Sequence, residues 1–512
     1  MRMDPRRGTL LLIAFTTALR LIWAAVLEAS NDESYHWLYT IHPDLSFFDH
    51  PPMTMLLVKL GLTLCGGWVH PFSIRLAFVL LFAGSQWILF RWTERWYGGR
   101  PAFAAVLALN LSGYYSAFAG SFAVPDSPFL FFALLTYWRL GEALVHPPEA
   151  NPLRSWFWVG IGFAGAMLSK YHAVFLPAGA VLYILVTPGQ RRVLRTPGPY
   201  LATLLGLLGF LPVLIWNLDH DWASFKFQGG RAKGESATLF HEGPIKWFVG
   251  PILYLLPWIW FWLVVEMVRC LRNFGRLEPI RRLLLCLCVT PLAFFLVVSF
   301  RSKDVLLHWP LVGFVPMYPL VSANWIRLKD THPKMARWFL GFWVASIVVL
   351  AGLVVAQSRF GIFTVPPPAK DPAADMSGWE SVGDEIRARG WLGEENVFFF
   401  TNRWYDSGQL AFYIREARPT ACYNSLDARG FAFWSRPEDY VGKTGYFVVA
   451  DEPPEEAVRR EYGSYFERID AVAEFPMTRM GKPFRTVRVY RGVNQRRPYP
   501  FAYTPRVEEA GK

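Results

Sequence analysis

Cysteine is scarce in this chain of 512 residues, and its five cysteines show no paired metal-ligand spacing. Cys286 and Cys288 lie inside an apolar run, where neither a zinc site nor a disulfide framework is expected. Charged residues are also few, at 18% of the sequence, whereas hydrophobic residues make up 53%. This composition excludes an ordinary soluble protein and indicates a polytopic membrane protein.

A long block of basic residues is missing as well, although the net charge is +12. The basic residues fall in short clusters between apolar runs, which is the distribution of cytoplasmic loops, so nucleic acid is excluded as a partner. We expect no cleavable signal, because residues 1–7 lead into a full-length apolar segment without a small-residue cleavage site. The sequence shows no internal repeat, which counts against a transporter built from duplicated bundles.

Long apolar segments predict about eleven membrane-spanning helices, because roughly 20 apolar residues cross a bilayer. Basic clusters precede the first segment and follow the second, sixth, eighth and tenth, whereas the loop at 146–155 after the fourth has Arg154 as its only basic residue. These loops are predicted to be cytoplasmic. The same alternation places loop 29–72 and everything after residue 358 on the extracytoplasmic side. The approximate segments are 9–28, 73–92, 101–120, 127–145, 156–170, 173–188, 199–217, 246–268, 281–300, 305–325 and 336–357.

A soluble domain of roughly 130 residues is predicted after a hinge at Pro366, Pro367 and Pro368. The expected organisation is a transmembrane domain at 1–360 and a small extracytoplasmic α/β domain with its tail at 361–512. Sequence pattern predicts strands at 397–401, 446–450 and 484–491, and helices at 377–389, 407–414 and 455–462.

Acidic and imidazole groups gather directly after the first apolar segment. Asp32 and Glu33 follow it, and Asp49 and His50 precede two prolines. These side chains are expected where lipid gives way to water, so loop 29–72 is interpreted as a catalytic loop at a membrane surface. Ordinary interfacial polar residues are the alternative, above all for Glu33.

An ordered set of motifs over roughly residues 5–360 resembles a known family. The set is similar to the family that contains protein O-mannosyltransferases and aminoarabinose lipid A transferases, which are GT-C type glycosyltransferases with polyprenyl-phosphate sugar donors. A looser likeness continues at Trp404, Tyr405 and residues 410–414. The motifs are Asp32-Glu33, residues 48–52 (FDHPP), residues 125–128 (PDSP), residues 168–171 (LSKY), Trp216-Asn217, residues 222–225 (WASF) and His308-Trp309.

The resemblance implies roles for three carboxylates. Asp32 matches the catalytic carboxylate and is expected to act as the general base that takes the acceptor hydroxyl's proton. Asp126 matches a second acidic position that helps to place substrate, although it could also be only the N-cap of a helix. Asp49 and His50 stand where relatives carry an acid followed by a lysine, or an Asp-X-His-Pro-Pro pattern; His50 could contact phosphate, ligate a metal or be an interfacial histidine.

Cations and aromatic residues on the same predicted side are candidates for substrate binding. Lys170 and Arg231 are expected to bind the donor phosphate, although Lys170 could instead extend to the membrane surface. The remaining substrate-binding candidates are Glu33, His50, Tyr171, Lys303 and His308.

No metal site is predicted, because Gln228 stands where the lipid A enzymes have a metal-binding histidine and glutamine is a poor transition-metal ligand. A divalent metal remains an open possibility, and no cofactor is expected with certainty. The sequence thus predicts a hexosyl- or pentosyltransferase of the inner membrane that uses a polyprenyl-phosphate sugar donor and a lipid or glycan acceptor such as lipid A. Protein O-glycosylation is the nearest alternative, and a flippase for polyprenyl-linked lipids is an alternative of another class.

Overall fold

The computed structural model describes residues 4–233, 242–302, 305–365, 371, 373–451 and 454–503. The chain divides into two compact units. The first comprises Met1–Ile22, His50–Leu57 and Arg75–Val349, and the second comprises Trp23–Asp49, Val58–Ile74 and Leu350–Lys512. The predicted hinge at Pro366, Pro367 and Pro368 and the candidate Lys303 lie outside the described residues.

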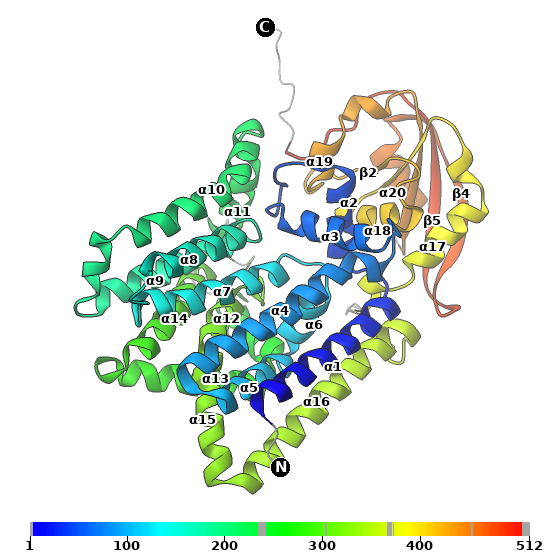
Figure 1. The fold of residues 1–512 in the computed structure, drawn as a ribbon. Helices are drawn as coiled ribbons and strands as arrows, with labels where there is room; N and C mark the ends of the chain where they lie inside the picture. The colour runs from blue at the N-terminus through cyan, green and yellow to red at the C-terminus, as the bar shows by residue number, and fades with distance from the viewer. Residues whose placement is uncertain are drawn as a thin grey trace. The chain divides into compact units, whose positions relative to one another are not determined.

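Helices make up the first unit, and Figure 1 labels them from blue to green along the chain. Four helices cross the boundary between the units: α1 (Pro5–Val26), α3 (Met53–Leu64), α4 (Pro71–Tyr97) and α16 (Pro333–Phe360). The others are α5 (Gly99–Asn110), α6 (Gly113–Ser121), α7 (Asp126–Leu144), α8 (Pro152–Met167), α9 (Phe175–Val186), α10 (Gly198–Asp219), α11 (Ala223–Lys233), α12 (Glu242–Leu255), α13 (Pro257–Arg272), α14 (Pro279–Ser299) and α15 (Tyr318–Thr331).

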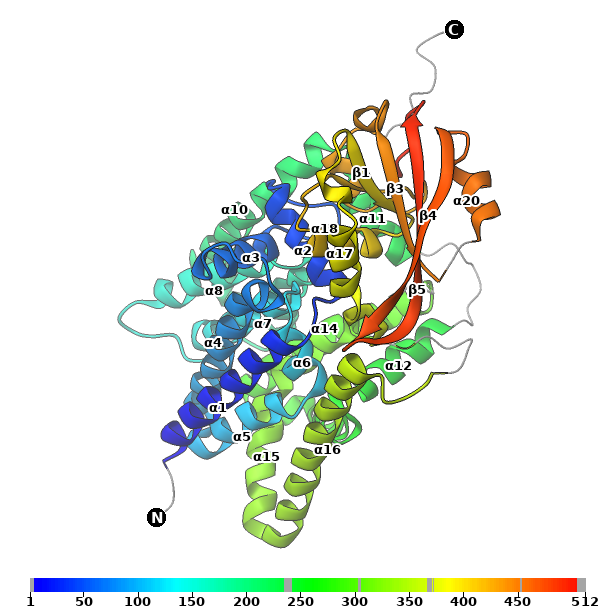
Figure 2. The same ribbon diagram turned by 90° about the vertical axis from the view of Figure 1, so that its right-hand side faces the viewer.

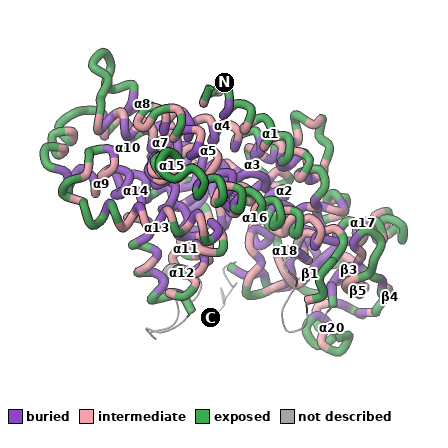
Figure 3. The backbone as a smooth tube through the Cα atoms, turned by 90° about the horizontal axis from the view of Figure 1, so that it is seen from below, coloured by how far each residue is buried: buried purple, intermediate pink, exposed green. Residues whose placement is uncertain are grey.

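Five of these helices are long and apolar enough to cross a membrane, and seven spans result if each of two bent pairs counts as one. The five are α1, α4, α10, α14 and α16. Only 6% of the apolar window of α16 is buried, and Figure 3 shows exposed and intermediate residues along this helix. Apolar side chains that the protein leaves uncovered are those expected to face lipid. The polytopic character is confirmed, whereas the count of eleven spans remains a prediction.

Two expected spans are broken in the structure. The segment at 101–120 forms α5 and α6, which meet at 77°, and the segment at 246–268 forms α12 and α13, which meet at 117°. Leu256 stands at the second break with a φ of 70°, and Pro257 follows it. A proline has no amide hydrogen to continue the preceding helix, so a break is favoured there. The expected span at 305–325 likewise begins as a 3-10 helix, Trp309–Met317.

Glycine allows close packing where α8 meets α7 and α10. A Cβ atom on Gly165 would lie 2.3 Å from the ring of Phe132, and one on Gly209 would lie 2.5 Å from the Cβ of Ala164. Helices in lipid gain little from the hydrophobic effect, so small residues that bring backbones together stabilise their association. Figure 1 shows α8 beside both α7 and α10.

A five-stranded mixed sheet forms the core of the second unit, with strand order β2-β1-β3-β5-β4. Strands β1 (Val397–Thr401), β2 (Thr420–Cys422) and β3 (Thr444–Ala450) are parallel, and β5 (Lys482–Gln495) joins β3 and β4 (Phe466–Arg479) in antiparallel pairs. Helices α17 (Trp379–Ala388) and α18 (Trp404–Ile414) cover one face, and α20 (Glu455–Tyr462) lies on the other (Figure 2). The short helix α19 (Phe431–Trp434) and helix α2 (Asn31–Ile41) also belong to this unit. The predicted α/β domain is confirmed.

Strands β2 and β4 were not predicted from the sequence. Strand β4 is an edge strand that carries charged residues and Pro476. Charges and proline on an edge strand discourage pairing with other chains, but they also hide the apolar alternation that a sequence pattern detects. Strand β2 has only three residues, which is too short for such a pattern.

The segment after α1 forms helix α2 (Asn31–Ile41), which packs against α18 within the second unit. The amide of Gln409 donates to the carbonyl of Ala29 at 3.0 Å and to Oδ1 of Asn31 at 3.1 Å. A Cβ atom on Gly408 would lie 3.1 Å from the backbone nitrogen of Tyr35. Helix α18 therefore positions the start of the predicted catalytic loop. The likeness to the family at residues 404–414 thus falls on a helix that supports this loop.

Candidate active site

Glu33 holds the first turn of α2 in place. One carboxylate oxygen of Glu33 accepts hydrogen bonds from the amide and the hydroxyl of Ser30, each at 2.9 Å, and the residue is fully buried. A glutamate at the third helical position that reaches back to the N-cap residue satisfies donors that a helix start leaves unpaired. The structure thus gives Glu33 a capping role, while its predicted contact with substrate stays a prediction.

Asp32 lies in the same turn but is exposed, and within the described residues its carboxylate accepts no hydrogen bond. The protein around this exposed carboxylate removes part of its hydration and so raises the pKa of Asp32, and the charges of Asp49 and Glu33 raise it further. His36 and Arg429 oppose that shift. A reachable carboxylate whose pKa is raised toward neutrality is suited to take a proton from a hydroxyl group.

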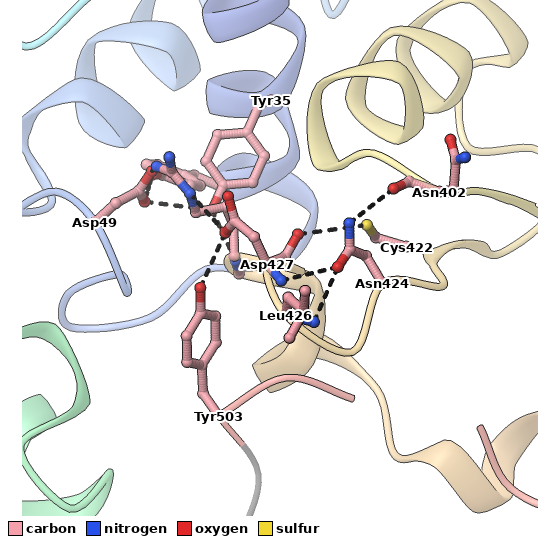
Figure 4. A network of polar contacts seen from close by, with 11 residues as sticks. Tyr35, Asp49, Asn402, Cys422, Asn424, Leu426, Asp427 and Tyr503 are labelled. Carbon is pink, nitrogen blue, oxygen red and sulfur yellow. Dashed lines mark hydrogen bonds and ion pairs between the residues drawn. The ribbon is translucent and has the colours of Figure 1, made fainter. Parts of the chain in front are cut away.

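Asp49, the second predicted carboxylate of this loop, is buried in a network of donors (Figure 4). One of its oxygens accepts a hydrogen bond from the hydroxyl of Tyr39 at 2.6 Å and a longer one from Tyr35 at 3.3 Å. The other oxygen pairs with the guanidinium of Arg429 at 3.2 Å. A buried carboxylate requires such partners, so Asp49 is held in one orientation.

The loop before α19 fixes Arg429 in turn. Arg429 has a φ of 48°, its Nε donates to Asp427 at 3.0 Å, and its guanidinium lies 4.6 Å from the ring centre of Trp404. Tyr503 also donates to Asp427, at 3.0 Å (Figure 4). Burial alone would lower the pKa of Arg429, but Asp49 and Asp427 raise it, so the guanidinium stays charged.

Asn424 shapes this loop from its other end. Its side-chain oxygen accepts the amides of Leu426 at 2.9 Å and Asp427 at 3.0 Å, and its amide group donates to the carbonyl of Asn402 at 3.0 Å (Figure 4). These bonds tie the loop to the end of β1, so the sheet of the second unit positions the cation beside Asp49.

A second cluster lies in the first unit, around Lys170 and Asp126. The ammonium group of Lys170 is 2.7 Å from a carboxylate oxygen of Asp126, and only 8% of the lysine side chain is exposed. Lys170 therefore does not extend to the membrane surface and instead meets an anion of the chain itself. Since an ammonium group has three hydrogens, two donors remain beyond this pair.

His308 and Tyr114 lie beside that ion pair. Their rings stack at 5.7 Å, and both residues line a small cavity of about 20 Å³ with Asp126 and Lys170. His50 belongs to the same unit and lies within electrostatic range of His172. The amide of Met53 donates to the carbonyl of Leu168 at 2.9 Å, which holds the segment after His50 beside the end of α8.

Tyr171 and Arg231 have partners within the first unit. The hydroxyl of Tyr171 is 2.6 Å from the hydroxyl of Ser224, which belongs to the WASF motif. The guanidinium of Arg231 lies 5.4 Å from the ring centre of Phe227 and 5.1 Å from that of Trp309. Such cation–π contacts hold a planar guanidinium in place.

The sequence analysis missed several residues of the hydrogen-bond network around Asp49, namely Tyr39, Asn424, Asp427, Arg429 and Tyr503. Arg429 is 380 residues from Asp49 in the chain, and nothing in its neighbourhood marks it as a functional residue. Asn424 and Asp427 form a turn that could be recognised locally, but which group the turn presents to Asp49 depends on the tertiary structure.

Comparison with solved structures identifies the fold. The structure superposes on that of ArnT from Cupriavidus metallidurans in the apo state with a TM-score of 0.65, covering 94% of this chain and 98% of that one at 15% identity. The chain has a GT-C glycosyltransferase fold. The structure of the same ArnT bound to undecaprenyl phosphate gives a TM-score of 0.62 over the same share of both chains.

Sequence comparisons agree with this GT-C fold. The family model of dolichyl-phosphate-mannose-protein mannosyltransferases matches residues 49–216. The lipid A galacturonosyltransferase RgtD of Rhizobium johnstonii is 24% identical over 88% of this chain and 94% of its own length. An undecaprenyl phosphate-alpha-4-amino-4-deoxy-L-arabinose arabinosyl transferase of Sodalis glossinidius is 27% identical over 59% of this chain and 55% of its own length. The resemblance predicted from the sequence is confirmed.

Proposed function

We propose that this chain is a membrane glycosyltransferase that moves a sugar from a polyprenyl-phosphate carrier to a lipid acceptor of the lipid A type. The observation that carries the proposal is the exposed Asp32 carboxylate, whose pKa is raised and which lies among charges that the fold holds in place. The names of the relatives support the same reaction class, since they act on lipid A or use an undecaprenyl-phosphate sugar.

In the proposed reaction, an acceptor hydroxyl attacks the anomeric carbon of the donor sugar. The hydroxyl proton passes to Asp32, a new C–O bond forms, and the bond to the phosphate oxygen breaks with its electrons on the departing polyprenyl phosphate. Asp49 is held in one orientation by Arg429, Tyr35 and Tyr39, and its charge helps to raise the pKa of Asp32. Asp49 and Asp32 thus have different roles because their surroundings differ.

Lys170 is proposed to hold the donor phosphate, with Asp126 orienting its ammonium group. Arg231, Tyr171 and His308 remain candidates for contacts with the donor in the first unit, and His50 for contacts with phosphate. The proposed location is the bacterial inner membrane, with the reaction on the extracytoplasmic side. That side rests on the alternation of basic loops along the sequence.

The substitution Asp32→Asn tests the base. Because asparagine cannot take the proton, we expect transfer to fall by about 100- to 10,000-fold while the protein still folds. The measurement is the release of free polyprenyl phosphate, together with the mass of the modified acceptor, in reconstituted membranes. Asp44→Asn is the matched control, because Asp44 is an exposed aspartate of the same loop and should keep normal activity.

Near-normal transfer by the Asp32→Asn variant would remove Asp32 from this role. If the unmodified protein releases no polyprenyl phosphate from any donor while it moves the intact lipid across the membrane, the flippase alternative holds. Transfer to a peptide hydroxyl in place of a lipid would select protein O-glycosylation.

The substitution Lys170→Ala tests phosphate binding. Loss of a charge-assisted hydrogen bond costs roughly 1.5–3 kcal/mol, so we expect a ten- to hundredfold weaker donor affinity. Lys226→Ala is the control, because Lys226 forms a comparable pair with Asp221 at 2.6 Å but on the exposed surface. An unchanged donor affinity in Lys170→Ala would contradict the assignment.

A further inference from the structure

The second unit contains a pocket of about 100 Å³ away from the Asp32 and Asp49 side chains. Its lining comes from the ends of four helices and from the segment before α4. The charged and imidazole side chains of the lining are Glu28, His70, Arg359, Glu380, Arg387 and Arg415. None of these residues has a part in the proposed glycosyl transfer.

Two of the charged residues already have internal partners. Glu28 accepts the amides of Gly378 at 2.9 Å and Glu380 at 3.3 Å, so its carboxylate caps the start of α17. Arg387 donates to the carbonyl of Tyr413 at 2.6 Å and to Asp384 at 2.5 Å. Because both charged groups already bind partners within the protein, neither side chain is a principal candidate for binding a ligand.

Arg415 is the available cation of the pocket. It ends α18 in the left-handed conformation with a φ of 58°, its side chain is exposed, and its guanidinium makes no hydrogen bond within the described residues. Glycine is the usual residue at such a helix end, because a side chain there costs roughly 1–2 kcal/mol. An arginine in a strained backbone position that lines a pocket suggests a function other than folding.

Two more donors accompany Arg415. Arg359 donates to the sulfur of Met480 at 3.1 Å, and a thioether is a weak acceptor; its charge also lies within electrostatic range of Glu28. His70 accepts the amide of Phe72 at its Nδ1, at 3.1 Å, which places the hydrogen of the neutral ring on Nε2. Two guanidinium groups around a small pocket match the oxygens of a phosphate group.

Exposed apolar side chains belong to the lining of this pocket or lie next to lining residues. Val26 lines it and ends α1, Phe360 follows Arg359 at the end of α16, and Trp68 stacks on His70 at 4.1 Å. All three are exposed, Phe360 by 51% and Trp68 by 49%. Since α1 and α16 are both candidate spans and tryptophan favours the membrane–water boundary, the pocket is expected at the level of lipid headgroups.

We propose that this pocket binds the phosphate of a membrane phospholipid headgroup, with Arg415 and Arg359 as the principal donors. The lipid would sit where α1 and α16 leave the bilayer, with its chains beside Val26 and Phe360. This assignment does not depend on the proposed glycosyl transfer, because the pocket shares no residue with either cluster of the candidate active site.

The test uses the full-length protein, freed of lipid in detergent. Binding of short-chain phosphatidylglycerol is measured by native mass spectrometry and by the shift in thermal unfolding. We compare the unmodified protein with Arg415→Gly, Arg359→Ala and the control Arg460→Ala, which changes an exposed arginine on α20 of the same unit. Arg415→Gly removes the guanidinium and also relieves the backbone, so a folding defect is not expected to confuse the result.

We expect the affinity for the lipid to fall about tenfold or more in Arg415→Gly and Arg359→Ala, and to stay unchanged in Arg460→Ala. Equal affinity in all four proteins would overturn the proposal. Inorganic phosphate that binds as tightly as the lipid would make this a site for free phosphate. Equal binding of a diacylglycerol with the same chains would show that the phosphate is not recognised.

Discussion

Arg429 offers the sharpest test of how the second unit organises its carboxylates. The substitution Arg429→Met keeps most of the volume of the side chain and removes its charge. Asp49, with a side chain only 5% exposed, would then lose this ion pair, while the hydroxyl groups of Tyr39 and Tyr35 still donate to it. Removing one partner of a buried ion pair typically costs about 3–5 kcal/mol, because the other charge stays behind unpaired.

The cost here should be smaller than that range. Two hydroxyl groups still solvate Asp49, and 17% of the Arg429 side chain is exposed, so water can replace part of the guanidinium. We therefore expect about 2–3 kcal/mol. For a unit of this size, a change of 1 kcal/mol moves the unfolding temperature by about 2–4 °C, so we expect a drop of about 4–12 °C. The assay is thermal unfolding of the full-length protein in detergent.

A double-mutant cycle with Asp49→Asn supplies the control. If the two residues stabilise the unit through their mutual contact, the combined variant should be more stable than the sum of the single losses predicts, by at least about 1 kcal/mol. Arg429 also lowers the pKa of Asp32, so its removal should shift the acidic limb of the activity profile to higher pH. Purely additive losses, or an unfolding temperature within about 2 °C of the unmodified protein, would refute the reasoning.

Two further predictions concern stability and topology. Burial raises the pKa of Glu416 to about 7, from 4.5, so the folded protein binds this proton more tightly than the unfolded chain. The resulting stabilisation of the folded state, at most about 3 kcal/mol, is complete below pH 4.5 and is lost as the pH rises through 7. In thermal unfolding, Glu416→Gln should make the stability depend less on pH. A pH profile identical to that of the unmodified protein would contradict this prediction. For topology, an impermeant thiol reagent added to intact inner-membrane vesicles of known orientation should label Ser464→Cys from the extracytoplasmic side but not Asn273→Cys, in a background without Cys65. The reverse pattern would place the candidate active site in the cytoplasm.

The family motifs led from the sequence to residues that the structure places in two internally packed clusters. The FDHPP motif supplies Asp49 to the second unit and His50 to the first. The PDSP and LSKY motifs supply Asp126 and Lys170, which form an ion pair at 2.7 Å. In contrast, two motifs have a clear architectural role: Ser224 of WASF bonds Tyr171, and the motif at residues 404–414 supports α2. A motif alone does not distinguish a residue that reacts from a residue that supports it, because both appear in the same short stretch of sequence.

The sequence by itself determined what depends on neighbours along the chain. Runs of apolar residues predict the helices α1, α10, α14 and α16, because each such run must satisfy its own backbone in lipid. The strand at 397–401 and the helix at 455–462 followed from local pattern in the same way. Only the tertiary structure decided where helices bend, as at Leu256, and which distant groups meet. Arg429 and Asp49 are the clearest case, because the free energy of their contact depends on burial and on a distance of 3.2 Å, and neither is a property of any local segment.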